Sequence, residues 1–209
     1  MHQIEEISSI KIQPAFFIGD DPVKIARELI GKTLVSDING QLTKGIIVET
    51  EAYRGVNDKA CHANNGKMTK RNEVMYGEGG QAYVYLCYGI HHLFNIVTNR
   101  KDKADAVLVR ALQAVEGEAY MKERFTSRRR LLLNGPGVLT KAMGITTAFS
   151  GESLMGNTVW LEEGICGFPP DEIVVSRRIG IDYAEEDAEL PWRFYWKGNE
   201  NVSKILAND

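Results

Sequence analysis

The fold is decided by residues 32–53, which read KTLVSDINGQLTKGIIVETEAY. Two runs rich in apolar and β-branched residues, Lys32–Asp37 and Gln41–Tyr53, flank the dipeptide Asn39-Gly40. Asn-Gly is the strongest short signal for a two-residue hairpin turn, because both residues tolerate the positive φ angles that this turn needs. The segment therefore predicts two antiparallel strands, around which the rest of the chain is interpreted.

The remaining sequence predicts a mixture of helices and further strands. Asp20-Asp21-Pro22 is typical of a helix start, and Gly31 offers a C-cap. Residues 54–81 show no clear periodicity, and a loop of this length in a compact domain is usually functional or disordered. The other expected elements are a second hairpin (Ala82–Tyr88 and His91–Thr98), a strand at Ala104–Ala111, helices at Glu116–Phe125 and Val138–Met143, and strands at Thr158–Leu161, Ile173–Ser176 and Arg193–Trp196.

This order of elements favours an α+β fold with a curved, mostly antiparallel sheet and flanking helices. No internal repeat or linker divides the chain, so residues 1–209 are interpreted as a single domain. Hydrophobic residues make up 44% of the chain and charged residues 25%, which is an ordinary globular balance.

Composition also argues against several classes of protein. No apolar run approaches the roughly 18 residues of a membrane span, and the N-terminus lacks the layout of a secretory signal. The three cysteines, Cys61, Cys87 and Cys166, form no CxxC pair, which disfavours a disulfide scaffold or a zinc ribbon. We therefore expect a cytoplasmic protein without a membrane partner, associated with the nucleoid if it is bacterial.

Charge is distributed unevenly along the chain. The net charge is −3, yet residues 101–141 carry nine basic and five acidic side chains, and residues 54–72 carry five basic side chains against Asp58 alone. Two basic stretches in an acidic chain are suited to one phosphate-binding face. The alternative is a solvated charge run such as Arg128–Arg130, and charge alone favours that alternative.

The strand Gly45–Tyr53 carries two carboxylates. Strict alternation places Ile47, Glu49, Glu51 and Tyr53 on one face, opposite a face formed by Ile46, Val48, Thr50 and Ala52. Glutamate is depleted in strands and costly to bury unpaired. The pattern leaves two alternatives open, a pocket-lining carboxylate and a solvent-facing surface paired with Lys or Arg.

Three tyrosines lie in the segment Tyr83-Val84-Tyr85-Leu86-Cys87-Tyr88. Tyr83 and Tyr85 share a face, for which core packing is the simpler interpretation. Tyr88 lies on the other face, beside the expected turn at Gly89, where it has little apolar surface of the fold to pack against. Tyr88 is thus a candidate anchor or wedge for a binding partner.

Common catalytic motifs are missing from the sequence. It has no Walker loop, GxSxG or GxGxxG motif, and its four histidines, His2, His62, His91 and His92, lack the spacing of a metal site. His91 and His92 are expected on opposite strand faces. His62, in the long loop after the glutamate strand, is a candidate stacking group over a pocket, although a solvated loop residue is the usual alternative. The turn Gly135-Pro136-Gly137 before a helix is a weak signal for an anion site.

Taken together, these segments resemble the alkyladenine (3-methyladenine) DNA glycosylase family. The resemblance covers about residues 14 to 204 in order, and VETEAY at 48–53 with YVYLCYG at 83–89 is its most specific part. Lys70 stands where the family usually has Pro, and Phe94 where Met is familiar. The other matching segments are LIGKTLV at 29–35, TKRN at 69–72, AVLVRAL at 106–112, NGPG at 134–137, RIGI at 178–181 and RFY at 193–195.

The resemblance implies a fold similar to the C-terminal domain of formyltransferases, and an enzyme that extrudes damaged purines from duplex DNA. By resemblance, Tyr88 fills the gap left in the base stack. The extruded purine stacks between Tyr53 on one side and His62 and Tyr85 on the other, and Asn95 disfavours the exocyclic amine of guanine.

The implied catalytic residues are Glu51, Arg110 and Ile179. Glu51 is the general base that activates a water, and Arg110 and the carbonyl of Ile179 also hold that water. The enzyme is expected to be a monofunctional monomer that leaves an uncut abasic site and needs no metal or organic cofactor. Two alternatives stay open on the sequence, a module that binds distorted DNA without chemistry and a formyltransferase-like domain that recognises RNA or a small substrate.

Overall fold

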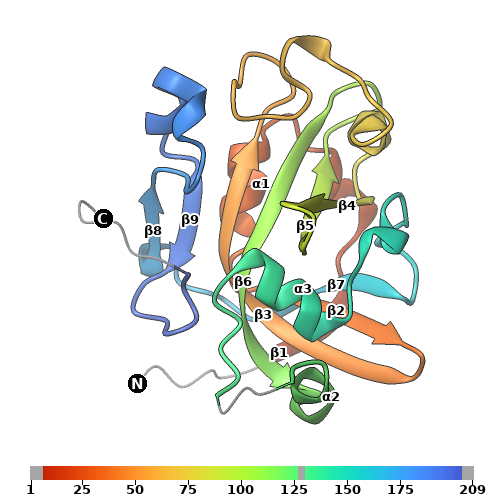
Figure 1. Ribbon diagram of the computed structural model, residues 1–209. Coiled ribbons are helices and arrows are strands. Elements are labelled where there is room, and N and C mark those ends of the chain that lie inside the picture. The colour runs from red at the N-terminus through yellow and green to blue at the C-terminus, as the bar shows by residue number, and fades with distance from the viewer. Residues whose placement is uncertain (1–6, 127–129, 204–209) are drawn as a thin grey trace.

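The computed structural model describes residues 7–126 and 130–203, and within them one open sheet of nine antiparallel strands carries the fold (Figure 1). The predicted α+β class is confirmed. His2, Arg128 and Arg129 lie outside the described residues. The strands are β1 Ile7–Lys11, β2 Thr33–Ile38, β3 Gln41–Tyr53, β4 Ala82–Cys87, β5 His91–Thr98, β6 Asp105–Glu116, β7 Val159–Ile165, β8 Ile173–Ser176 and β9 Arg193–Trp196. The helices are α1 Pro22–Glu28, α2 Glu118–Glu123 and α3 Pro136–Met143, with 3-10 segments at Pro14–Ile18, Asn64–Gly66, Glu73–Tyr76, Thr147–Phe149, Pro170–Glu172 and Asp182–Glu189.

The opening hairpin forms as predicted. Asn39 and Gly40 have φ angles of 56° and 75° and join β2 to β3, with Ile38 opposite Gln41. Strand β3 is 13 residues long. Its first half pairs with β2, whereas Glu49–Glu51 pair with β9, and its other edge pairs with β6. The middle of β3 is buried because neighbouring strands cover both of its edges and packed side chains cover its faces.

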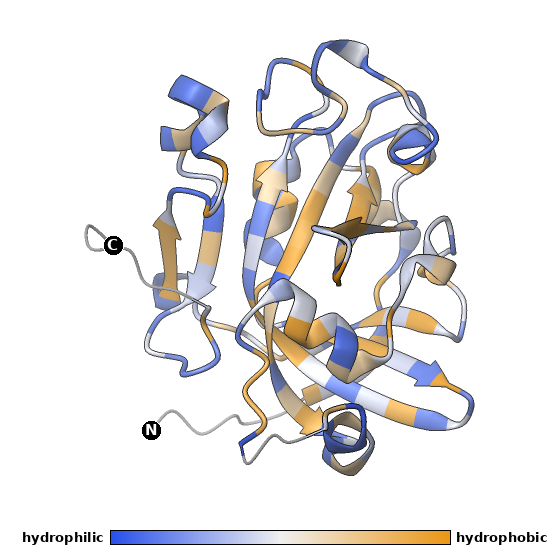
Figure 2. Cartoon of the chain, viewed as in Figure 1, coloured by the Kyte–Doolittle hydropathy of each residue, from blue (hydrophilic) through white to orange (hydrophobic). Residues whose placement is uncertain are grey.

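The main hydrophobic core lies between one face of the sheet and the helices α1 and α3. Asp21 caps α1 by accepting a hydrogen bond from the backbone N–H of Val23 at 3.0 Å, and Pro22 occupies the first helical position. A cap of this kind stabilises a helix by about 1 kcal/mol. Figure 2 shows apolar residues along much of β6, in keeping with its place in the centre of the sheet.

The alternation predicted for β3 is wrong for both faces at the start of the strand, because Ile46, Ile47 and Val48 each lie on the face opposite to the one predicted relative to Thr50 and Ala52. Ile47 packs in the main core with Ala52, whereas Ile46 and Val48 pack in a separate cluster with Ala111. The register between β3 and β6 shifts between Ile47 and Glu49, and such a bulge reverses the side to which the next residues point.

Element boundaries differ from the predictions where tertiary pairing extends a strand. Strand β6 continues to Glu116, so α2 is confined to Glu118–Glu123, and β7 runs on to Ile165. Helix α1 ends at Glu28, before Gly31. Strand β1, which pairs with β7, was not predicted. Among the described residues, no helix has both the length and the apolar character that crossing a membrane requires.

Candidate active site

The site is built around two glutamates in the middle of β3. The side chains of Glu49 and Glu51 are both fully buried, which contradicts the solvent-facing alternative. Adjacent Thr50 points the other way, and its hydroxyl donates to the carbonyl oxygen of Ala26 in α1 at 2.7 Å. The carboxylates therefore lie on the face of β3 opposite α1, where each needs charged or hydrogen-bonding partners.

Glu51 accepts hydrogen bonds from three groups. The hydroxyl of Tyr53 donates to its Oε2 at 2.8 Å, Nη1 of Arg110 donates to the same atom at 3.2 Å, and the backbone N–H of Ile179 donates to Oε1 at 2.7 Å. The structure thus places Tyr53, Arg110 and Ile179 around Glu51. The contact from Ile179 to Glu51 comes from its backbone amide, whereas the resemblance singles out its carbonyl as a holder of the water.

Charge and burial act together in this cluster. Burial opposes the charged form of Arg110, but the charges of Glu51 and Glu49 outweigh it and raise the pKa of Arg110 above its ordinary value. Burial, followed by the charge of Glu51, raises the pKa of Tyr53 well above 10.0. At neutral pH, Arg110 is therefore a cation and Tyr53 a neutral hydrogen-bond donor.

An aromatic wall stands beside the carboxylates. The rings of Tyr83 and Tyr85 lie 5.4 Å apart, and the ring of His62 lies 4.7 Å from that of Tyr85. Nδ1 of His62 is 2.9 Å from the hydroxyl of Tyr83. Burial, assisted by the charge of Arg71, lowers the pKa of His62 from 6.5, so its imidazole is neutral at physiological pH. Tyr83 is buried in a hydrophobic cluster against which the half-buried Tyr85 packs, in keeping with the core interpretation, and both side chains also line a cavity.

That cavity has a volume of about 640 Å³. This volume lies within the range of small-molecule sites, which is roughly 300–1,000 Å³. Every predicted site residue except Glu51 lines the cavity. Glu51 lies directly behind three of the lining residues, to which it is hydrogen-bonded. The predicted residues that line the cavity are Tyr53, His62, Tyr85, Tyr88, Asn95, Arg110 and Ile179. The amide group of Asn95 donates to the carbonyl oxygens of Tyr83 and Leu93, at 3.1 and 3.3 Å. A larger hollow of about 720 Å³ beside α1 contains none of these residues.

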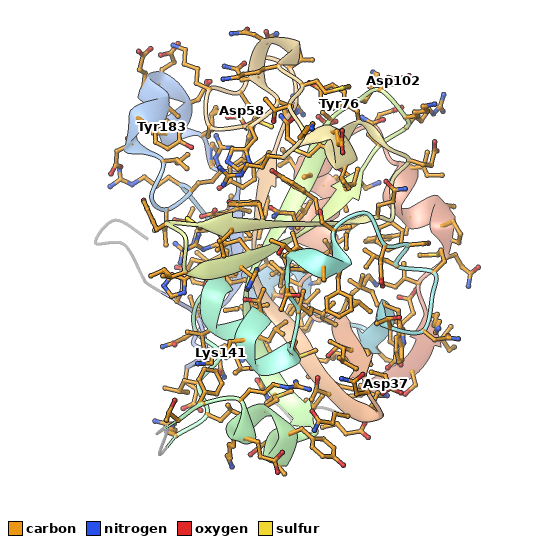
Figure 3. All side chains as sticks on the ribbon, turned by 45° about the vertical axis from the view of Figure 1, so that its right-hand side comes forward. Asp37, Asp58, Tyr76, Asp102, Lys141 and Tyr183 are labelled. Carbon is orange, nitrogen blue, oxygen red and sulfur yellow. The ribbon has the colours of Figure 1, made fainter. Side chains whose placement is uncertain are left out.

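Two exposed tyrosines border the cavity. Tyr88 is 92% exposed at the tip of the β4–β5 hairpin, as predicted. Tyr183, which the sequence did not single out, is 66% exposed, and its hydroxyl donates to the carbonyl oxygen of Ala60. Figure 3 labels Tyr183, Asp58 and Tyr76 at one end of the molecule and Lys141 and Asp37 at the other.

A buried ion pair joins the walls of the cavity. Asp58 and Arg178 are both fully buried at their side chains, and two guanidinium nitrogens donate to the carboxylate at 2.7 and 2.9 Å. The guanidinium also lies over the ring of Tyr53, 4.8 Å from its centroid. Sequence reasoning did not assign this pair. The available signal was that Asp58 is the single acidic residue within residues 54–72.

Part of the basic charge near the site is paired. Arg54 pairs with Asp21, and Lys59 pairs with Glu185 and Glu186 of the segment Asp182–Glu189. Lys67 and Lys70 are exposed. Arg130 pairs with Glu200.

The two departures from the family pattern do not enter the cavity. Phe94 is buried in the main core, on the opposite side of β5 from Asn95, and Lys70 lies on the surface. His91 and His92 both border a hollow of about 480 Å³ beside α3. Within residues 7–126 and 130–203, no three side chains of His, Cys, Asp or Glu gather as a metal site would require.

Comparison with known proteins places the chain in a family. Residues 16–200 match the family described as Methylpurine-DNA glycosylase (MPG). A relative from Chlamydia abortus is 45% identical over 86% of this chain and 95% of its own length. Relatives from Chlamydia pneumoniae and Bacillus cereus are both 43% identical, over 94% and 91% of this chain and 100% and 98% of their own lengths. All three carry the name "Putative 3-methyladenine DNA glycosylase". The chain therefore belongs to the methylpurine-DNA glycosylase family, and it is a DNA-repair hydrolase that cleaves N-glycosyl bonds.

Proposed function

We propose that this enzyme flips alkylated or deaminated purines out of duplex DNA and hydrolyses their N-glycosidic bond with a water activated by Glu51. The observation that carries the proposal is the buried Glu51 carboxylate, whose three donors all line one cavity. A carboxylate accepts about four hydrogen bonds. Three positions are occupied, and the remaining one on Oε1 is suited to a water.

The walls of the cavity suit an extruded purine. Extrusion costs a few kcal/mol and is easiest for damaged or mismatched bases. The ring of Tyr88 would occupy the vacated stack, while Tyr53 on one side and His62 with Tyr85 on the other would hold the base. Electron-rich rings favour an electron-poor alkylated purine. Asn95, on the cavity wall, would disfavour the exocyclic amine of guanine.

The chemistry would proceed by hydrolysis. The bond between the sugar's anomeric carbon and the base nitrogen breaks with its electron pair moving to the base, and the water oxygen bonds to that carbon while its proton passes to Glu51. The carboxylate charge also stabilises the oxocarbenium-like sugar. The described residues that line the cavity include Arg71 and Arg110 but no lysine, which supports a monofunctional enzyme that leaves an abasic site. The names of its relatives make 3-methyladenine the first lesion to test.

The proposal is tested with Glu51→Gln. Gln keeps the shape of the side chain but cannot accept the proton of water, so single-turnover excision of hypoxanthine or 3-methyladenine from a duplex should fall by about 100-fold or more. Binding to the lesion duplex should persist. The control is Glu162→Gln, which alters another buried glutamate that is paired with Lys44, outside the cavity.

The reaction products are assayed with and without alkali. Strand cleavage that appears only after alkali supports the monofunctional reaction, whereas cleavage without alkali contradicts it. Excision at the parent rate by the Glu51→Gln variant would show that Glu51 is not the base.

A further inference from the structure

Glu49 is the second carboxylate of the site, and it lies behind the cavity. It does not line the cavity, and its side chain is fully buried. Its Oε1 accepts hydrogen bonds from Nε of Arg110 at 2.9 Å, from Nε of Arg193 at 2.8 Å and from the hydroxyl of Ser203 at 2.8 Å. Its Oε2 accepts from the backbone N–H of Ser203 at 2.7 Å. Glu49 therefore connects β3 to β6, to β9 and to Ser203 through hydrogen bonds.

The guanidinium of Arg110 is held in three directions. Its Nε donates to Glu49, its Nη1 to Glu51, and its Nη2 to the hydroxyl of Ser203 at 3.4 Å. A guanidinium is planar, so contacts from these three nitrogens determine both its position and its tilt. The contact to Glu49 thus directs Nη1 at Glu51.

The charged side chains that hydrogen-bond to the two glutamates, within the part of the chain that the structure describes, are two arginines. Glu49 and Glu51 contribute two negative charges, while Arg110 and Arg193 contribute two positive charges, and all four side chains are buried. Removing the charge of Glu49 would leave an excess positive charge in a buried site and would take from both Arg110 and Arg193 the carboxylate that holds them.

We propose that Glu49 is a positioning residue, which together with Ser203 fixes Arg110 so that Arg110 orients Glu51. The proposal rests on the proposed function, because it assigns Glu49 no contact with the substrate or the water. Displacement of a catalytic group by about 1 Å can cost on the order of 100-fold in rate. The loss should therefore appear in the chemical step and not in lesion binding.

The test compares Glu49→Gln with Glu162→Gln, its matched buried control. We expect Glu49→Gln to lower the single-turnover excision constant by about 10- to 100-fold with little change in the Kd for a lesion duplex. Ser203→Ala should act in the same direction with a smaller loss, and it serves as the second variant if Glu49→Gln does not fold. Melting temperatures identify the folded variants.

A double mutant separates positioning from an independent role. If Glu49 acts only through Arg110 and Glu51, adding Glu49→Gln to Glu51→Gln should cause no further loss of rate. A multiplicative loss, or a folded Glu49→Gln variant with the parent rate, would overturn the inference while the proposed function stands. If Glu51→Gln kept the parent activity and Glu49→Gln were inactive, Glu49 would be the base. That result would overturn both this inference and the proposed function.

Discussion

At the scale of the residue, Tyr88 combines an exposed ring with an unusual backbone. Its φ angle is 51° and that of Gly89 is 71°, and the backbone N–H of Ile90 donates to the carbonyl oxygen of Cys87 across the turn. Positive φ is unfavourable for a residue with a side chain and costs on the order of 1 kcal/mol. Such strain concentrates at functional sites. Glycine or asparagine would suit this position better, so the tyrosine ring itself is the feature that needs an explanation.

We expect Tyr88→Ser to reduce excision from duplex DNA without lowering the melting temperature, because a ring that is 92% exposed contributes little packing. Stacking on bases is worth roughly 1–3 kcal/mol, so excision of a well-paired lesion should fall by about tenfold or more. The loss should be smallest when the lesion lies opposite a mismatch or a gap, where extrusion costs less.

The control for Tyr88 is Tyr88→Phe, which keeps the ring and should retain excision. The measurements are melting temperature and single-turnover excision of paired and mispaired hypoxanthine. A large fall in melting temperature, together with an equal loss of activity on every substrate, would indicate core packing in place of a wedge.

At the scale of the element, the segment after β3 is held by the pair of Asp58 and Arg178. Asp58 also accepts hydrogen bonds from the backbone N–H groups of Arg54 and Ala60, at 3.1 and 3.0 Å. Arg178 donates to the carbonyl oxygens of Ala52 and Asp187. The pair thereby connects the loop that carries His62 with the segment that carries Ile179, two parts of the site that lie outside the sheet.

We expect Asp58→Asn to destabilise the protein by about 3–5 kcal/mol, because it leaves the Arg178 guanidinium buried without its counter-charge. Urea denaturation measures this change in the free energy of unfolding. Excision by the folded protein should also fall, because the loop that carries His62 and the segment that carries Ile179 are no longer held together. Lys59→Ala, which removes a surface ion pair one residue away, should cost far less. Equal stability losses in the two variants would contradict a special role for the buried pair.

At the scale of the whole molecule, a net charge of −3 must be reconciled with a DNA substrate. Lys59 is already paired with Glu185 and Glu186, and Arg54 with Asp21, so these side chains are poor candidates for phosphate contacts. Lys67 and Lys70 are exposed in the same segment as His62 and are better candidates. Whether the basic stretches at 54–72 and 101–141 form one DNA-binding face stays a prediction.

We expect non-specific duplex affinity to fall steeply with salt, because neutralised phosphates release counterions. Replacing Lys67 and Lys70 by Ala should reduce the slope of the logarithmic salt plot by about 1 for each lysine that contacts a phosphate. The control is Lys24→Ala, in α1 on the opposite face of β3 from Glu51. A flat plot for the parent, or the same change of slope in the control, would show that these lysines are only solvated surface.

Local patterns were sufficient to predict much of the fold. The signals for these elements lie between neighbouring residues, as in the turn Asn39-Gly40, the helix start Asp21-Pro22 and the alternating runs. The two hairpins, the start of α1 and the strands at 173–176 and 193–196 could therefore be predicted without tertiary information. The same holds for the outward position of Tyr88, because a residue in the three-residue turn between β4 and β5 has no strand neighbour to cover it.

Only the tertiary structure decided which groups meet. The bulge that moves Ile47 into the main core depends on pairing between β3 and β6. Apart from Tyr53, which lies two residues from Glu51, these partners of the two glutamates are distant in sequence: Arg110 is 59 residues from Glu51, Ile179 is 128 residues from it, and Arg193 is 144 residues from Glu49. No local periodicity encodes such contacts, since they form only when β6, β9 and the loop after β8 pack beside β3. For the same reason, the sequence pattern left the burial of Glu49 and Glu51 open, and the packed sheet decided it.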